Sequence, residues 1–144
     1  MSDYIPTTHK FVAVLNKKVP TGNAMNALAH ATAGLIGLHP DIQAMRFNDY
    51  FDQDGGTHAS ISDNPFIILE ADNSNKLRTF RQALQEAGIP FTDFTSTMTV
   101  GTYADQQERT KATPEVDLEY WAVVTFGDAE KLKELTKKFS LLRS

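Results

Sequence analysis

Hydrophobic residues along this chain alternate between short continuous runs and stripes with helical spacing. Residues 11–15 (Phe-Val-Ala-Val-Leu), 66–69 (Phe-Ile-Ile-Leu) and 120–126 form apolar runs, which are typical of strands covered on both faces. Residues 89–94 alternate in part between large apolar and smaller polar side chains and predict a fourth strand. Between these runs, apolar residues recur every three or four positions, as in amphipathic helices. The pattern predicts an α/β fold with three layers (α/β/α), in which helices cover both faces of a mixed sheet of about four main strands.

The first predicted helix, residues 21–38, follows the strand at 11–15 through a polar turn at residues 20–23. We expect His39-Pro40 to end it, because proline disfavours helical backbone at the residue before it. One stripe of this helix consists of small residues at helical spacing: Ala24, Ala27, Ala31 and Gly34. Since small side chains let a helix lie close to its neighbour, we expect this stripe to face the sheet.

Three more helices are predicted, at residues 74–87, at residues 102–112 and from Asp128 onward. Gly88 should stop the first of them, because glycine readily adopts the left-handed conformation that ends many helices. Thr102 and Asp105 form a variant of the capping box at the start of the second. Pro114 is expected at the first position of one more helical turn, and residues 139–142 as a short closing strand.

Residues 44–62 predict an inserted β-hairpin, since two strand-like pieces flank the turn sequence Asp-Gln-Asp-Gly-Gly at 52–56. Four apolar residues are expected at exposed positions of this hairpin: Met45, Phe47, Tyr50 and Phe51. Exposed aromatic clusters often mark interfaces. The hairpin therefore supports one hypothesis for the function, an interaction protein without enzymatic activity, and predicts a homodimer or higher homo-oligomer.

Composition limits the class of protein. A chain of 144 residues fits a single domain spanning residues 1–144. The net charge of −4 does not favour a nucleic-acid partner, and the lack of cysteine excludes disulfides and thiolate catalysis. The N-terminus does not have the pattern of a signal peptide, and no apolar run approaches the ~20 residues that cross a bilayer. We therefore expect a cytoplasmic protein that does not insert into membranes.

The turn into the first helix is the leading candidate site, because strand-to-helix turns in α/β proteins often bind ligands and helix N-termini favour anions. Thr21, Gly22 and Asn23 form this turn. Asn23, Asn26 and His30 then share one face of the helix. Together they can hold a small polar or anionic ligand. A purely structural explanation stays open, in which Asn23 caps the first turn and His30 is a partly buried histidine with satisfied hydrogen bonds.

A second group of candidates follows the strand predicted at residues 89–94, the third of the main strands in chain order. Thr95, Ser96 and Thr97 can donate hydrogen bonds to a ligand, although the strand propensity of threonine also explains the threonines. Tyr103 and Arg109 lie on a short polar helix and can close over a pocket. An exposed helix rich in Gln and Glu explains the same residues without a ligand.

No metal site or cofactor is expected. The histidines at positions 9, 30, 39 and 58 are scattered and show no HExxH or comparable spacing. Asp52, Asp54 and Gly55 resemble half of a calcium loop, but a bidentate glutamate at the required spacing is missing. No serine lies in a nucleophile-elbow pattern, so a serine hydrolase is not indicated.

Motifs along nearly the whole chain resemble known families. The opening strand, turn and helix, with the pair His30-Ala31, resemble the N-terminal signature of type-II peptidyl-tRNA hydrolases. The chain more closely resembles a small uncharacterised bacterial family related in fold to those hydrolases. The shared motifs are Thr21-Gly22-Asn23-Ala24 with Asn26-Ala27, Tyr103 through Glu108-Arg109 to Ala112-Thr113-Pro114, and Leu135-Thr136 to Leu141-Leu142-Arg143. This resemblance implies a type-II peptidyl-tRNA-hydrolase-like fold and a family without an established activity.

The chain departs from the hydrolases at the residues that the resemblance would make catalytic. The hydrolases have a catalytic lysine after the glycine turn and a glutamine one helical turn later, and the corresponding residues here are Asn23 and Ala27. In place of their acidic residue after the third strand, this chain has hydroxyl residues. Losing a cation that stabilises developing charge removes much of the catalytic power. The leading hypothesis is therefore a small polar or anionic ligand bound at the first turn, with the oligomeric interaction protein as the alternative. Residual peptidyl-tRNA or ester hydrolysis is the least supported reading.

Overall fold

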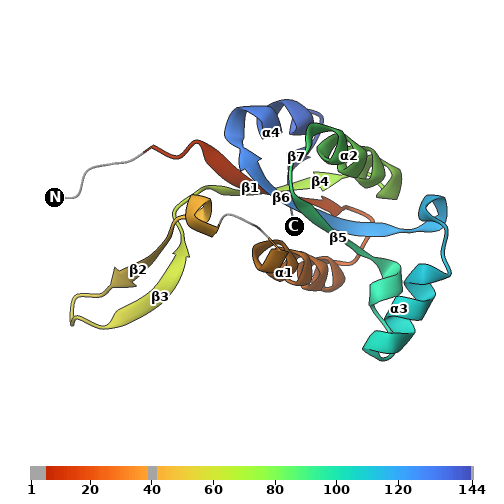
Figure 1. The fold of residues 1–144 in the computed structure, drawn as a ribbon, viewed down its shortest axis with the longest axis horizontal. Coiled ribbons are helices and arrows are strands. Elements are labelled where there is room, and N and C mark those ends of the chain that lie inside the picture. The colour runs from red at the N-terminus through yellow and green to blue at the C-terminus, as the bar shows by residue number, and fades with distance from the viewer. Residues whose placement is uncertain (1–5, 39–41, 144) are drawn as a thin grey trace.

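The computed structural model describes residues 6–38 and 42–143 of the chain, and its centre is a five-stranded mixed sheet (Figure 1). The strands are β1 (His9–Asn16), β4 (Phe66–Ala71), β5 (Phe91–Thr95), β6 (Tyr120–Asp128) and β7 (Ser140–Leu141). Their order is β5-β6-β1-β4-β7, with β1 and β4 parallel and the other neighbours antiparallel. The mixed sheet with four main strands is confirmed, and β7 lies within the predicted closing strand.

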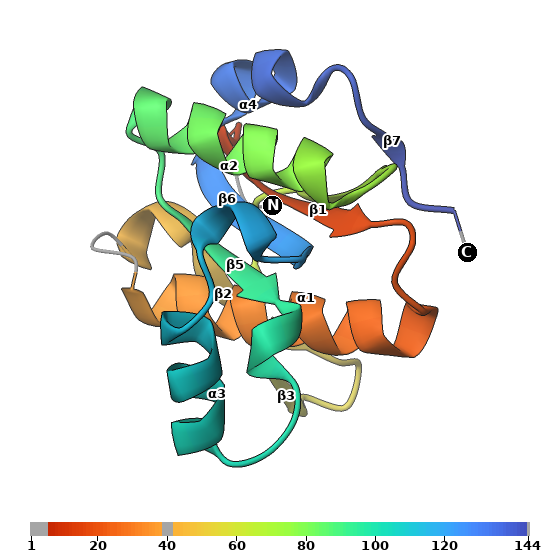
Figure 2. The ribbon, with the colours of Figure 1, turned by 90° about the vertical axis from the view of Figure 1, so that its right-hand side faces the viewer.

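Helices lie on both faces of this sheet, as the sequence predicts (Figure 2). The helices are α1 (Thr21–Leu38), α2 (Ser74–Ala87), α3 (Tyr103–Lys111) and α4 (Ala129–Thr136). α1 packs on one face, whereas α2 and α4 pack side by side on the other. Within the described part of the chain, no helix combines the length and the apolar character needed to cross a membrane.

The central strand β1 explains why its sequence is continuously apolar. Phe11, Ala13 and Leu15 belong to the core beneath α1. Val12 and Val14 belong to the core beneath α2 and α4. All five side chains are buried, because each face of the strand is covered by a helical layer.

The predicted helix ends are set by specific capping contacts. The side chain of Asn73 accepts a hydrogen bond from the Lys76 backbone N–H at the start of α2. Gly88 ends α2 with φ 69°, the left-handed conformation for which glycine is suited. Thr102 and Asp105 form the reciprocal capping box at the start of α3. These caps confirm the boundaries expected from the sequence.

Two further predictions concern prolines near helix ends. Pro114 lies one position earlier than predicted, because it is the N-cap of a short 3-10 helix, Glu115–Asp117, and not its first residue. Its carbonyl accepts a hydrogen bond from the Asp117 N–H at 2.9 Å. α1 ends at Leu38, as predicted. His39-Pro40, which we expected to end it, lies outside the described residues.

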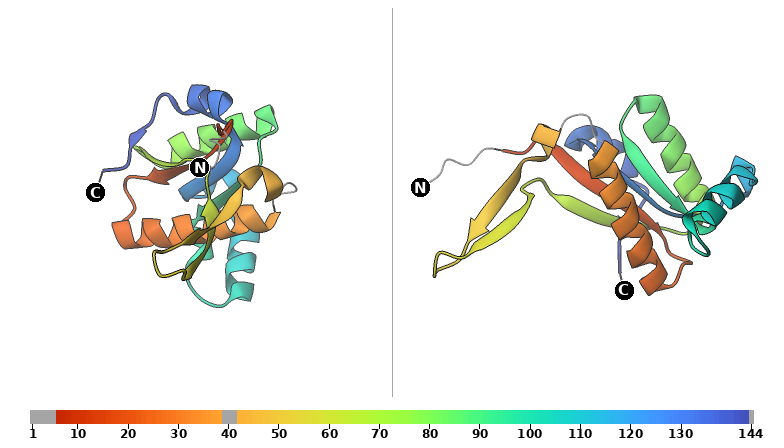
Figure 3. Two further views of the ribbon diagram at one scale, coloured as in Figure 1. Left: turned by 90° about the vertical axis from the view of Figure 1, so that its left-hand side faces the viewer. Right: turned by 60° about the horizontal axis from the view of Figure 1, so that its bottom comes forward.

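The predicted hairpin is confirmed and projects from the body of the molecule (Figures 1 and 3). β2 (Phe47–Phe51) and β3 (Thr57–Ser62) form a separate antiparallel pair. At the turn between them, the Asp52 carboxylate accepts hydrogen bonds from the backbone N–H groups of Asp54 and Gly56. The expected exposure of Met45 is wrong. This residue precedes the hairpin and is fully buried in the core beneath α1.

Candidate functional site

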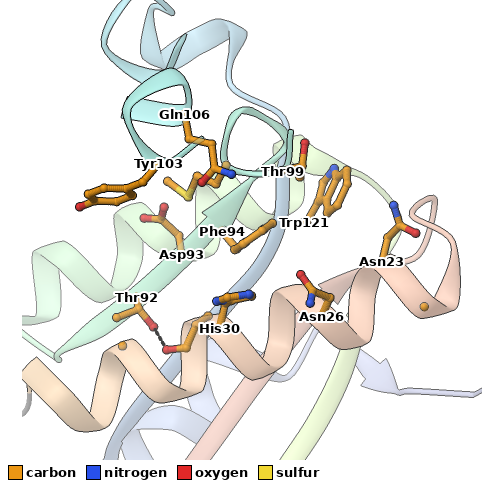
Figure 4. A pocket seen from close by; sticks show the side chains of 14 residues that line it. Asn23, Asn26, His30, Thr92, Asp93, Phe94, Thr99, Tyr103, Gln106 and Trp121 are labelled. Carbon is orange, nitrogen blue, oxygen red and sulfur yellow. Dashed lines mark hydrogen bonds between the residues drawn. The ribbon is translucent and has the colours of Figure 1, made fainter. Parts of the chain in front are cut away.

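An open pocket of about 680 Å³ lies on the α1 side of the sheet, beside the edge strand β5 (Figure 4). α1 forms one wall, and residues of β5 and β6 form the floor. α3 and the segment that joins it to β5 form the opposite wall. Ala24, Ala27 and Ala31 are buried against the sheet, as predicted, whereas Gly34, expected in the same stripe, is exposed and lines the pocket. α1 therefore lies close to the strands, and the pocket opens beside it.

The wall from α1 carries polar side chains that the sequence places on one helix face. Gly22, Asn23, Asn26 and His30 all line the pocket. Farther along the helix, the Ala31 carbonyl accepts a hydrogen bond from the Thr92 hydroxyl at 2.5 Å. This bond ties α1 to β5 beside the pocket (Figure 4).

The floor of the pocket is aromatic. The His30 ring stacks on the Phe94 ring, with a centroid distance of 5.8 Å and an interplanar angle of 26°. The Phe94 ring in turn contacts Trp121, with centroids 5.9 Å apart. The indole N–H of Trp121 donates to a Glu119 carboxylate oxygen at 3.0 Å. The three rings form a continuous surface of ring faces along one side of the pocket, apolar at Phe94 and Trp121.

The wall from α3 is held in place by its neighbours. Tyr103 and Gln106, one helical turn apart, line the pocket together with Met98 and Thr99. The guanidinium of Arg109 donates to the backbone carbonyls of Thr97 at 3.0 Å and of Val100 at 2.9 Å. These bonds join α3 to the segment before it, so the wall does not depend on apolar burial of α3, which has no buried residue.

Five of the ten predicted site residues meet in this pocket, and five do not. Gly22, Asn23, Asn26, His30 and Tyr103 line it. The remaining five lie elsewhere: Thr21, Thr95, Ser96, Thr97 and Arg109. The pocket therefore brings together half of the predicted site residues, from α1 and α3, and leaves the hydroxyl residues Thr95, Ser96 and Thr97 outside.

The hydroxyl residues at the end of β5 and directly after it have structural partners. Thr95 and Thr97 are buried, and their hydroxyl oxygens lie 2.7 Å apart. The Thr97 hydroxyl also bonds the Thr110 hydroxyl on α3 at 2.8 Å. The backbone N–H of Ser96 donates to the Glu119 carbonyl. These contacts join β5, α3 and the start of β6.

Sequence reasoning missed several residues of the pocket, notably Phe94, Gln106 and Trp121. For Trp121, the alternation of side chains along a strand could have predicted which face of the sheet it lies on. Tyr120 packs in the core beneath α2, and Trp121 packs on the α1 side. Helical spacing likewise relates Gln106 to Tyr103. Neither pattern reveals which strand and which helix meet across the sheet edge.

The pocket carries little net charge. Among the described residues that line it, none is Lys or Arg. Its one carboxylate, on Asp93, is paired with Arg81 of α2, with 2.8 Å between Oδ2 and Nε. Burial alone would lower the pKa of Arg81, but the hydrogen bond and charge of Asp93 outweigh it and raise that pKa. Amides, hydroxyls and aromatic rings therefore dominate the chemistry of the pocket.

A second polar network lies on the other face of the sheet, at the N-terminal end of β6. The Arg78 side chain donates to a Glu115 carboxylate oxygen at 2.8 Å, and the Tyr120 hydroxyl donates to the same oxygen at 2.8 Å. These hydrogen bonds, first from Tyr120 and then from Arg78, lower the pKa of Glu115. Burial and the bond to Glu115 raise the pKa of Tyr120 to about 12. The network ties α2 to the segment before β6.

No group of three or more metal-ligating side chains occurs within residues 6–38 and 42–143. The acid–base groups among the described lining residues of the pocket are the His30 imidazole, the Tyr103 phenol and the ion-paired Asp93 carboxylate. This set suits binding through hydrogen bonds and ring contacts.

Comparison with known proteins identifies the family. A family model described as "Protein of unknown function (DUF2000)" matches residues 9–143, so the chain belongs to the DUF2000 family. The solved structure of Atu0240, a protein of unknown function from Agrobacterium tumefaciens strain C58, is similar. It shares 17% sequence identity and a TM-score of 0.79, covering 94% of this chain and 98% of that one. No curated protein matches. The expectation of a family without an established activity is confirmed.

Proposed function

We propose that this DUF2000 protein binds a small, uncharged polar ligand with a flat ring in the pocket between α1 and α3. The observation that carries the proposal is the meeting of three side-chain amides with an aromatic surface. Asn23, Asn26 and Gln106 line the same pocket as Phe94 and Trp121. An amide can donate and accept hydrogen bonds, and ring faces offer a flat apolar contact. The volume lies within the usual range for small-ligand sites.

An anionic ligand is the less favoured form of this proposal. Gly22 and Asn23 lie in the first turn of α1, where backbone N–H groups carry partial positive charge. However, no described lining residue is a lysine or arginine, and Asp93 adds a carboxylate at the floor of the pocket. A neutral ligand needs no positively charged side chain from the pocket, and the Asp93 carboxylate does not repel it. We therefore narrow the sequence hypothesis of a polar or anionic ligand to a neutral one.

We also propose that the fold is related to that of type-II peptidyl-tRNA hydrolases, with binding kept and hydrolysis lost. Asn23 stands at the position where the resemblance places a catalytic lysine. Ala27, at the position of the glutamine, is fully buried between α1 and the sheet. A polar group there would face the core and not the pocket. The Asp93 carboxylate, the one carboxylate among the described lining residues, is already held by Arg81 in an ion pair of 2.8 Å.

Matched pairs of aromatic amides and carboxylates test the proposal. Benzamide and benzoate differ in the charged group, as do nicotinamide and nicotinate. Trp121 is the chain's single tryptophan and lines the pocket, so its fluorescence reports binding directly. We expect each amide to bind more tightly than its carboxylate. Tighter binding of the carboxylates, or no binding by any probe, would contradict the proposed ligand class.

Two neighbouring glutamines supply the control. Gln106 lines the pocket, whereas Gln107 is exposed on the same helix and lines a different depression. Replacing Gln106→Leu removes one amide and should weaken amide binding about three- to tenfold, the value of one hydrogen bond. Gln107→Leu should leave the affinity unchanged. Equal affinity of both variants would place the ligand outside this pocket.

A further inference from the structure

The hairpin formed by β2 and β3 is exposed along its whole length. Every residue of β2 is exposed, and only the last residue of β3 is partly covered. Figure 3 shows that the hairpin extends beyond the sheet and its helices. An isolated two-stranded hairpin is marginally stable in water. Such a hairpin becomes more stable when another protein surface covers it.

The root of the hairpin is nevertheless well fixed. Arg46 and Asp63 form an ion pair at 2.9 Å across its base. The side-chain amide of Asn64, which is buried, donates to the backbone carbonyls of Ala44 at 3.1 Å and Met45 at 2.9 Å. These contacts set the direction in which the hairpin leaves the body. The hairpin therefore leaves the body in a fixed direction, and residues 47–62 are called the arm.

The arm combines apolar surface with negative charge. Phe51 is 71% exposed, Ile61 59% and Tyr50 51%. Residues 47–62 contain three aspartates and no lysine or arginine. A partner for this arm must offer an apolar groove with a positively charged rim.

The same chain carries such a groove on another side of the molecule. The groove has a volume of about 640 Å³ and lies between the first turns of α1 and the C-terminal segment. Met25 and Leu142 contribute exposed apolar surface, and Lys17 and Arg143 add positive charge. Among the described residues that line it, Glu70 is the one acidic residue. Figure 2 shows β7 and α1 bordering this side.

The charge of the C-terminal segment strengthens the match. Residues 129–143 contain five lysines and arginines and two glutamates. The arm and this segment therefore carry opposite net charge. Because the arm points away from the body (Figure 3), its tip and the groove are separate surfaces. Contact between them then requires two copies.

We propose that the chain forms a two-fold homodimer in which the acidic, aromatic arm of each copy lies in the groove of the other. Two-fold dimers are the commonest symmetric assembly, and each arm–groove contact then occurs twice. The dimer covers Phe51 and Tyr50 with apolar groove residues and places aspartates near Lys17 and Arg143. Because opposite charges contribute, higher salt weakens it.

Sedimentation of charge-reversed variants over a concentration series tests this dimer. The arm variant is Asp49→Lys with Asp54→Lys, and Asp52 is kept because it holds the turn. The groove variant is Lys17→Glu with Arg143→Glu. We expect the wild type at twice the 16.0 kDa chain mass. Each variant alone should raise the dimer Kd about tenfold or more, because like charges then face each other.

Mixing the two variants provides the decisive step. In the mixed dimer, the positive arm of one chain meets the negative groove of the other, and the unchanged arm meets the unchanged groove. An equimolar mixture should therefore recover the wild-type Kd. A control with Lys76→Glu and Lys111→Glu makes the same charge change as the groove variant, on exposed residues of α2 and α3. This control should dimerise normally. A monomeric wild type, variants that dimerise normally, or a mixture that stays dissociated would each overturn the proposal.

Discussion

One face of the sheet is covered by α2 and α4 together, whereas in the part of the chain that the structure describes α1 is the one α-helix packed on the other face. On the two-helix face, Leu77, Phe80 and Leu84 are buried and fill the space above β1 and β6. On the α1 face, small residues hold the helix close to the strands. The edge of the sheet at Phe94 and Trp121 is then left for the pocket.

The difference shows how this fold makes room for a site without loosening its core. Large side chains close one face, and a helix of small residues leaves the edge of the other open. α3 does not cover that edge as a packed helix, because it buries no residue of its own. It forms a wall at a distance, held by polar contacts such as those of Arg109.

The largest effect is expected from the closed face. Phe80→Ala removes a ring that is 2% exposed and should cost about 3–5 kcal/mol of unfolding free energy. Phe94→Ala should cost less, because one side of that ring already borders the open pocket. Urea unfolding of both variants measures the difference. An equal loss would mean that the pocket side is packed as tightly as the closed face.

Alkaline titration sharpens the comparison through Tyr120, which belongs to the closed face. Its pKa is about 12 in the folded protein against 10.0 for the free side chain. The unfolded chain therefore loses this proton first, and stability falls as the pH rises from 10 to 12. The loss from this group is about 2–3 kcal/mol. Tyr120→Phe should lack it, as measured by urea unfolding across this range. A parallel decline in both proteins would contradict the assignment.

Enlarging the small-residue stripe should lift α1 from the sheet. Ala27 is fully buried, so Ala27→Leu overpacks the interface and should cost about 1–3 kcal/mol. Ala33 is exposed on the same helix, and Ala33→Leu should change stability by less than about 0.5 kcal/mol. Thermal unfolding compares the two variants. Tolerance of leucine at position 27 would show that α1 does not lie as close to the sheet as described.

The smallest effect on stability is expected from the wall that α3 forms. Thr102 caps α3 through the Asp105 backbone N–H. Thr102→Ala should therefore cost about 1 kcal/mol. The loss should concentrate in faster amide hydrogen exchange of α3, with α2 unchanged. Uniformly faster exchange in both helices would indicate that α3 is part of the cooperative core.

Elements with local signals could be predicted from the sequence. The bounds of α1 and α2 follow from apolar spacing and from Gly88, whose left-handed backbone is observed at the end of α2. The hairpin follows from the Asp-Gly-Gly turn. Met45 was predicted wrongly, because its burial depends on a distant core and not on its neighbours in sequence. The cytoplasmic location stays a prediction.

The pocket could be predicted only in part, because its walls come from distant segments. Asn23, Asn26 and His30 share a helix face and were found by spacing alone. Trp121 and Gln106 reach the same pocket only through the pairing of β5 with β6 and the position of α3. Thr97 has the right chemistry, but its hydroxyl bonds Thr95 and Thr110. Sequence shows which groups are present, and tertiary contacts decide which are available.

Side-chain NMR during a benzamide titration tests the central claim most directly, because each lining amide and the indole N–H gives its own signal. We expect the signals of Asn23, Asn26, Gln106 and Trp121 to shift together with one Kd, and equal concentrations of benzoate to move them less. Shifts confined to the Asn73 and Asn75 amides, which line a separate pocket beside α2, would contradict the account. So would a titration in which no side-chain signal moves.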